Sequence, residues 1–153
     1  MSVLSDRHIE DEVSRGFLIS ENFSSSSVTP NGYDIRVGMV RLGTEESGRA
    51  VVGPRRYFLT SSMEFFNFPD NVVGQIWIRS SYARKGIFGS FGFIDAGFRG
   101  NLTLSFFNGS DSEIEIASGD RIAQLVFTRL EEAVERSYSD RSGNYQESRG
   151  IKT

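Results

Sequence analysis

Short apolar segments separated by turn residues fill the chain from Tyr57 to Leu130, and this pattern does most to limit its fold. Apolar and polar residues alternate in 72–81 and 102–108, as they do in half-buried β-strands, and 122–130 is typical of a final long strand. The 16 glycines provide many positions for tight turns. Strand-like segments at intervals of about 8–12 residues are typical of a sandwich or a barrel. We therefore predict an all-β fold, a distorted barrel of the jelly-roll kind.

The two ends of the chain differ from this pattern. Ser5 is a good N-cap and apolar residues follow it at helical spacing, so we predict a short N-terminal helix that ends near Gly16. After Leu130 the sequence becomes polar and poor in aliphatic residues. We therefore predict one β domain over residues 1–130 and a flexible C-terminal tail over residues 131–153. The tail is either frayed or a lid that closes over a ligand.

Composition excludes several kinds of chemistry. The chain has no cysteine and one histidine, His8, so it holds no disulfide, no cysteine zinc site and no cage of several histidines. A net charge of −3 gives no overall positive field to attract nucleic acid. No apolar run approaches the roughly 18 residues of a membrane span. The beginning of the chain is too acidic for a signal peptide, and the lack of cysteine fits a reducing cytoplasm, where we place the protein.

A basic cluster follows the first long strand of this region. Residues 79–85 contain three cations, Arg79, Arg84 and Lys85, and two serine hydroxyls, in an otherwise acidic chain. Guanidinium groups and hydroxyls are good ligands for phosphate. The cluster is either a phosphate site or a solvated basic loop.

Two further residues are candidates for chemistry. Asp95 stands between an apolar strand and a glycine-containing turn, so it either shapes the turn or orients and deprotonates a water molecule. Gln124 interrupts an apolar strand, and its amide needs hydrogen-bond partners there. That amide either contacts a ligand or is satisfied within the core.

Taken in order, these segments resemble the dUTPase and dCTP deaminase superfamily. Residues 32–36 (GYDIR), 79–86 (RSSYARKG), 94–100 (IDAGFRG) and 119–125 (GDRIAQL) are similar to its motifs, and residues 138–146 resemble the C-terminal lid of its deaminases. The resemblance covers nearly the whole chain. It implies the dUTPase-like β-clip fold, a nucleotide ligand and a homotrimer with active sites between subunits.

The superfamily contains two chemistries, and one position favours the hydrolytic one. Its deaminases carry a glutamate in an L-E-F-x-N pattern, where this chain has Ser105. A serine does not act as a general base at neutral pH without an activating partner. We therefore expect a dUTP diphosphatase, which hydrolyses dUTP to dUMP and pyrophosphate with Asp95 activating the water. The alternatives are a dCTP deaminase, a bifunctional enzyme that makes dUMP from dCTP, and a non-catalytic nucleotide-binding protein.

The resemblance also implies roles for residues around the substrate. Phe98 packs on the deoxyribose, and the hairpin 89–93, which includes Phe93, contacts the base through its backbone. Mg²⁺ binds mainly to the triphosphate oxygens, without a metal site built from protein residues. The implied phosphate ligands are Arg79, Ser80, Ser81, Arg84 and Gln124, and the implied lid contacts are Tyr138, Tyr145 and Gln146.

Overall fold

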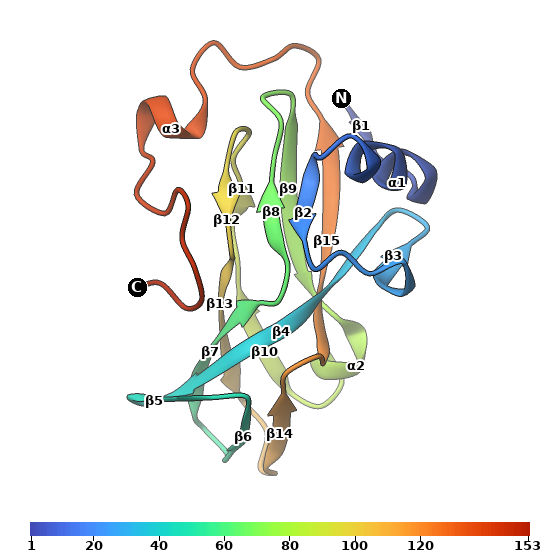
Figure 1. Cartoon of the computed structure of the whole chain (residues 1–153). Helices are drawn as coiled ribbons and strands as arrows, with labels where there is room; N and C mark the ends of the chain where they lie inside the picture. Colours follow the sequence, from blue (N-terminus) through green and yellow to red (C-terminus); the bar gives the residue numbers. More distant parts are fainter.

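The computed structural model describes all 153 residues, and most of its regular structure is β-strand (Figure 1). The helical elements are α1 (Asp6–Ser14), the 3₁₀ turn η1 (Ser25–Ser27), α2 (Ser80–Ala83) and α3 (Tyr138–Arg141). The strands are β1 (Ser2–Val3), β2 (Leu18–Glu21), β3 (Val28–Thr29), β4 (Gly32–Leu42), β5 (Glu45–Ser47), β6 (Arg49–Val52), β7 (Tyr57–Ser62), β8 (Phe65–Asn67), β9 (Val72–Ile78), β10 (Ile87–Ser90), β11 (Phe93–Ile94), β12 (Arg99–Gly100), β13 (Thr103–Asn108), β14 (Ile114–Ala117) and β15 (Arg121–Arg129).

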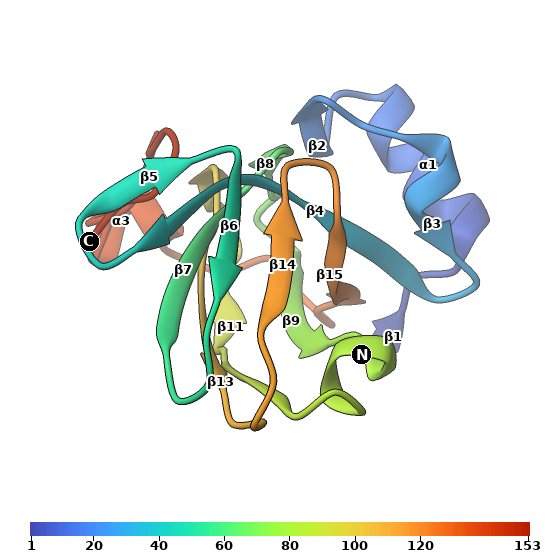
Figure 2. The same ribbon diagram turned by 90° about the horizontal axis from the view of Figure 1, so that it is seen from below.

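One curled antiparallel sheet organises the chain. Its main path runs β10-β13-β7-β4-β15-β9-β11, and β1, β3 and β5 pair at its sides. Two smaller sheets, β12-β8-β2 and β14-β6, complete the fold. Figures 1 and 2 show the large sheet curling, with the long strand β4 crossing the molecule obliquely. The predicted all-β, barrel-like fold with a short N-terminal helix is confirmed. No helix here has the length and apolar character needed to cross a membrane.

The alternation seen in the sequence explains which faces are buried. On β13, Leu104 and Phe106 point into the core and are almost fully buried, whereas Ser105 and Phe107 point outward. Phe106 stacks on Phe58 of the neighbouring strand at a ring separation of 5.1 Å. Each such side chain contributes about 2 kcal/mol by leaving water. The core between the curled sheet and the smaller sheets is therefore built from every second residue of the strands.

A buried ionic network joins β4 to the turn between β7 and β8. The Glu64 side chain is completely buried, and its carboxylate accepts hydrogen bonds from Tyr33 Oη at 3.0 Å, Arg36 N at 3.1 Å and Arg36 Nε at 2.8 Å. Burial raises the pKa of Glu64, and the Arg36 guanidinium opposes that rise. Burial, together with the nearby Glu64 charge, also raises the pKa of Tyr33 to about 12. The network is satisfied only while all three side chains are present.

We predict that Glu64→Gln lowers the free energy of unfolding by about 3 kcal/mol, because it leaves the partly buried Arg36 without its counter-charge. Urea denaturation followed by circular dichroism measures this change. Glu45→Gln is the matched control, since Glu45 is exposed and forms no ion pair, and its unfolding midpoint should stay unchanged. An equally small change in both variants would contradict the structural role of the network.

The C-terminal tail lies against the β domain of its own chain. Glu147 N donates to Arg99 O at 2.7 Å, and Asn101 N donates to Ser148 O at 2.8 Å, so the tail runs beside β12. Arg149 forms two hydrogen bonds with Glu21, at 2.7 and 2.8 Å. These contacts describe where residues 146–149 dock, while the flexibility of the tail stays a prediction.

Gly97 allows the tail to approach the turn after β11. It has a φ of +82°, and a Cβ at this position would lie 2.8 Å from Ser137 Cβ and 3.3 Å from Tyr138 N. Tyr138 N in turn donates to Ala96 O at 3.1 Å. A side chain at residue 97 would therefore strain the backbone and push the tail away.

We predict that Gly97→Ala loosens the tail and makes it more sensitive to trypsin, which cleaves after Arg136, Arg141 and Arg149. Time courses of limited proteolysis, read by mass spectrometry, measure the cleavage rate. Gly92→Ala is the matched control, because nothing lies within 4 Å of a Cβ there. If both variants are cleaved at the wild-type rate, the close packing at Gly97 does not hold the tail.

Candidate functional site

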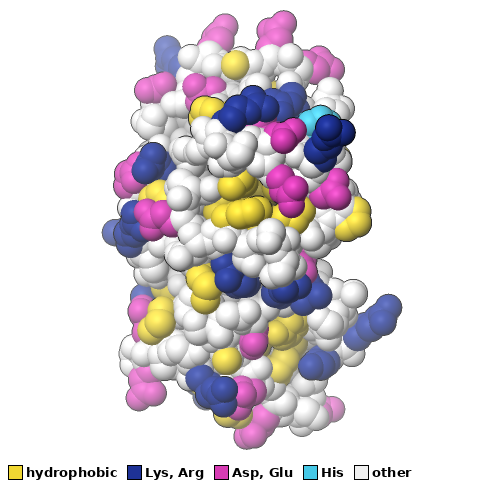
Figure 3. Space-filling view, turned by 45° about the vertical axis from the view of Figure 1, so that its right-hand side comes forward, with side chains coloured by type: hydrophobic (Ala, Val, Ile, Leu, Met, Phe, Trp, Pro, Cys, Tyr) yellow, Lys and Arg dark blue, Asp and Glu magenta, His cyan; other side chains and the backbone are white.

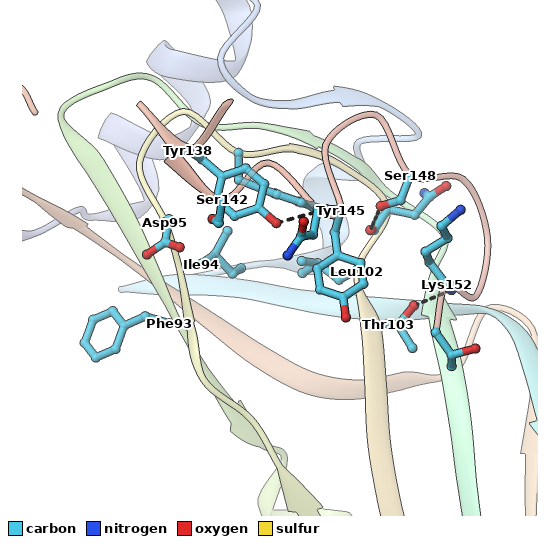
Figure 4. Close-up of a pocket in the computed structure, with 14 residues that line it drawn as sticks. Phe93, Ile94, Asp95, Leu102, Thr103, Tyr138, Ser142, Tyr145, Ser148 and Lys152 are labelled. Atoms are coloured by element: carbon cyan, nitrogen blue, oxygen red, sulfur yellow. Dashed lines mark hydrogen bonds between the residues drawn. The ribbon is translucent and has the colours of Figure 1, made fainter. Parts of the chain in front are cut away.

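A cavity of about 730 Å³ opens between the β11–β13 region and the C-terminal tail (Figure 4). Among the residues that line it, Asp95 is the only one with a side-chain carboxylate and Lys152 is the only one with a cationic side chain. They lie at opposite ends of the lining residues in Figure 4. The remaining lining residues are apolar, aromatic or neutral polar. A mostly apolar cavity with a few convergent polar groups is typical of a small-molecule site.

Asp95 is placed in the cavity by a short strand and a tight turn. Ile94 is buried and pairs with Gly74 of β9, which fixes the strand just before the aspartate. Phe98 N donates to Asp95 O at 3.1 Å and closes the turn. The Asp95 carboxylate itself is exposed and forms no hydrogen bond or ion pair within the chain. Its oxygens are therefore free to accept a proton or to bind a ligand.

Aromatic residues form one wall of the cavity. Phe98 is buried and meets Tyr138 edge to face, with ring centroids 5.5 Å apart. Tyr138 Oη accepts a hydrogen bond from Tyr145 N at 3.0 Å, which ties two parts of the tail together. Tyr145 and Phe93 are exposed and also line the cavity. The structure thus brings together five predicted site residues: Asp95, Phe93, Phe98, Tyr138 and Tyr145.

Gln146 lies behind the cavity and does not line it. Its Nε2 donates to Gly97 O at 3.0 Å, and its Oε1 accepts from Arg99 N at 2.9 Å. The side chain therefore fastens the tail to the turn that carries Asp95. Gln146 thus supports the site within the chain, and its contact with a ligand stays a prediction.

The basic cluster, residues 79–85, includes α2. Its first arginine, Arg79, is held by residues of the neighbouring strands. Arg79 Nε lies 3.2 Å from Asp34 Oδ2, and Arg79 Nη1 donates to Arg121 O at 3.0 Å. Burial raises the pKa of Asp34, and the two arginines oppose that rise. Ser80, Ser81 and Arg84 are exposed beyond this ion pair. Gln124 Nε2 donates to Thr29 Oγ1 at 2.9 Å, so the amide has one partner within the chain.

Within one chain the basic cluster and the cavity lie apart. Gly74 of β9 stands opposite Ile94 at the cavity, and Arg79 follows the other end of the same strand. Five residues of extended strand span about 16 Å. Figure 1 shows α2 and α3 at opposite ends of the molecule. The predicted phosphate ligands therefore do not line the cavity that contains Asp95 in the same chain.

The cavity also contains residues that the sequence did not single out. Thr103, Asn144 and Lys152 line it. Strand alternation places Thr103 on the outer face of β13 and could have identified it, whereas no pattern marks Asn144 or Lys152. Ser105 shares the outer face with Thr103 but does not line the cavity, and its hydroxyl donates to Ser90 O at 3.1 Å. No group of three or more His, Asp or Glu residues is placed to hold a metal.

The chain is similar in sequence to dCTP deaminases and in fold to a dCTP deaminase and a dUTPase. A dCTP deaminase of Thermococcus gammatolerans is 41% identical over 97% of this chain and 94% of its own length. A dCTP deaminase of Pyrococcus horikoshii is 43% identical over 84% of the chain and 85% of its length. The structure of a dCTP deaminase from Agrobacterium tumefaciens superposes with a TM-score of 0.73 at 23% identity, over 84% of this chain and 49% of that one. The structure of a dUTPase of Staphylococcus bacteriophage 80alpha superposes with a TM-score of 0.51 at 24% identity, over 71% of this chain and 84% of that one.

The expectation of a dUTP diphosphatase is wrong. The relatives with 41% and 43% identity are named dCTP deaminase, whereas the dUTPase structure at 24% identity shows likeness of fold alone. The expectation depended on Ser105, and this residue is bonded to Ser90 O outside the cavity lining. Ser105 does not line the cavity of a single subunit, so its identity alone does not determine which reaction the protein catalyses.

Residues 38–130 match the family model described as dCTP deaminase-like, which is more than half of the chain. The match includes β13, the basic cluster and the turn that carries Asp95. The relative from Thermococcus gammatolerans aligns with 97% of the chain, so the similarity also includes segments outside residues 38–130. The chain therefore belongs to the dCTP deaminase-like family.

Proposed function

We propose that this chain binds dCTP and removes the amino group of its cytosine ring. The observation that carries the proposal is the 41% identity to a dCTP deaminase over 97% of the chain. The cavity supports it, because its volume of about 730 Å³ is in the range that small-molecule ligands occupy. The reaction places the protein in the metabolism of pyrimidine deoxynucleotides.

Deamination needs a group that moves protons at the ring. A water molecule adds across the double bond between ring nitrogen N3 and the carbon that bears the amino group, so that the oxygen bonds to the carbon and N3 gains one proton. The second proton then passes to the amine, which leaves as ammonia while the carbon–oxygen double bond forms. Asp95 is the only side-chain carboxylate in the cavity lining and has no partner within the chain, so it is free to relay these protons from the water to N3 and to the leaving amine. We assign this role to Asp95 in place of the glutamate that Ser105 replaces.

The aromatic wall provides surfaces for the base and the sugar. Phe98 and Tyr138 form a fixed edge-to-face pair, and the exposed rings of Tyr145 and Phe93 extend the apolar surface. Such surfaces stabilise flat heterocycles by stacking and by exclusion of water. Mg²⁺ bound mainly to the triphosphate oxygens belongs to the same proposal, because such an ion keeps several waters and needs few protein ligands.

We further propose that the working unit is a homotrimer whose sites combine two subunits. The distance between the basic cluster and the cavity supports this arrangement, since a nucleotide that reaches both would need the cluster of another copy. Aromatic side chains on the outer sheet faces also support it. Phe88, Phe107 and Tyr57 stand side by side across three strands, and Trp77 is 55% exposed. Figure 3 shows surface patches of hydrophobic side chains bordered by charged groups.

A second candidate is a deaminase that proceeds to dUMP. A relative from Aquifex aeolicus, 33% identical over 97% of this chain and 92% of its own, is named dCTP deaminase, dUMP-forming. In that case Asp95 would also direct water at the phosphate chain. Product analysis separates the two candidates.

We predict that the protein converts dCTP to a uracil nucleotide and ammonia, and that Asp95→Asn lowers kcat at least about 100-fold because the proton acceptor is lost. Chromatography of the products, with and without Mg²⁺, distinguishes dUTP from dUMP. Asp11→Asn, which changes an exposed carboxylate of α1, is the control and should leave the rate unchanged. A wild-type protein that binds dCTP without forming any uracil product would contradict the activity. Full turnover by Asp95→Asn would contradict the role of Asp95.

Mixed assemblies test whether a site combines two subunits. We predict that Arg84→Gln and Asp95→Asn are each inactive alone, and that co-expression in equal amounts restores about one quarter of the wild-type rate by random assembly. Activity of co-purified mixtures with distinguishable tags measures this. The two homogeneous variants mixed after assembly, without subunit exchange, are the control. No recovery in the mixed assemblies would mean that Arg84 and Asp95 do not act in one site between subunits.

A further inference from the structure

A second, smaller hollow adjoins Asp95, Tyr138 and Ser142 next to the large cavity. Its volume is about 240 Å³, and the segment between β15 and α3 forms much of its wall. Two arginines of the tail, Arg136 and Arg141, line it. The tail thus places two cationic side chains beside the carboxylate of Asp95.

The two arginines have no partner within the chain. Neither guanidinium makes a hydrogen bond or an ion pair, whereas Arg149 of the same tail is held by two bonds to Glu21. Guanidinium groups present a planar fork of N–H donors that suits phosphate oxygens. Their donors are therefore available to a ligand in the hollow.

The frame of the hollow is fixed by backbone contacts. Val134 N donates to Asp70 O at 3.0 Å, and Tyr138 N donates to Ala96 O at 3.1 Å. The close approach at Gly97 holds Ser137 against the same turn. These contacts position the chain on both sides of Arg136.

The charged side chains that line the hollow carry a net positive charge, although further carboxylates lie nearby. Asp140 is engaged by Ser137, whose backbone N–H and hydroxyl lie 3.3 and 3.1 Å from Asp140 Oδ2. Glu135 is exposed and does not line the hollow, and Asp70 stands behind Gly97. Asp95 is the one carboxylate in the lining, against two guanidinium groups. An oxyanion there would be attracted by two charges and repelled by one.

We propose that this hollow is an oxyanion site for phosphate groups, formed by Arg136 and Arg141. Its ligand is inorganic phosphate or pyrophosphate, or the terminal phosphates of a nucleotide whose nucleoside occupies the large cavity. The nucleotide source rests on the proposed function, and the inorganic source does not. Because Asp95 repels the anion, its neutralisation strengthens binding when no divalent cation is present.

Calorimetric titration with pyrophosphate, without divalent metal, tests the site on the full-length protein. We expect binding to wild type, a loss of at least about tenfold in the double variant Arg136→Gln/Arg141→Gln, and tighter binding in Asp95→Asn. The double variant Arg7→Gln/Arg56→Gln removes two exposed arginines that are also unpaired and lie outside the hollow, so it should bind as wild type does. Thermal unfolding checks that all variants are folded.

Several results would overturn the assignment. These are absent binding to wild type, unchanged affinity in the tail variant, and an equal loss in the control variant. Titration of dCTP and of deoxycytidine into Asp95→Asn, with and without the tail substitutions, distinguishes the sources. A loss for dCTP but not for deoxycytidine identifies nucleotide phosphates, and a loss for pyrophosphate alone identifies a free anion. Deaminase activity is measured separately, so this site can fail while the proposed function holds.

Discussion

The buried carboxylate of Glu64 is the constraint on which much of the architecture depends. A charge without access to water needs compensation, and Tyr33 and Arg36 of β4 provide it. The same residue also organises the region of the cavity, because Glu64 O accepts a hydrogen bond from Asn101 Nδ2 at 2.8 Å. Asn101 Oδ1 in turn accepts from Gly150 N at 3.0 Å. One network thus links the central strand to the segment before β13 and to the docked tail.

The candidate site depends on contacts between distant parts of the sequence. The turn around Asp95 contributes a free carboxylate, and the tail contributes aromatic rings on one side and unpaired arginines on the other. The basic cluster of α2 is held in a different place by Asp34. Positive charge is therefore divided between two regions of an acidic chain, which suits a polyanionic ligand held between elements better than one bound to a single loop.

The strands and five of the 14 residues that line the cavity could be predicted from the sequence, because these signals are local. Alternation over 102–108 determines which side chains of β13 face the core, and the glycine-containing turn determines that Asp95 follows a strand end. The resemblance implied ligand contacts for Gln124 and Gln146, and the structure gives Gln124 Nε2 and both polar atoms of Gln146 partners within the chain. Their contacts with a ligand stay predictions. Sequence reasoning also gave Ser105 decisive weight for the reaction, although the position of one residue within a strand does not reveal what its side chain meets across the fold.

The sequence by itself determined the class of fold, the motifs of the superfamily and the position of Asp95 at the end of a strand, since strand period and turn chemistry act over a few residues. Only the tertiary structure decided which of these motifs meet. Gly97 and the tail are 40 residues apart along the chain, and their contact requires the sheet to curl and the tail to return along β12. The separation of Arg79 from Asp95 follows from the length of β9, because an extended strand holds its two ends apart.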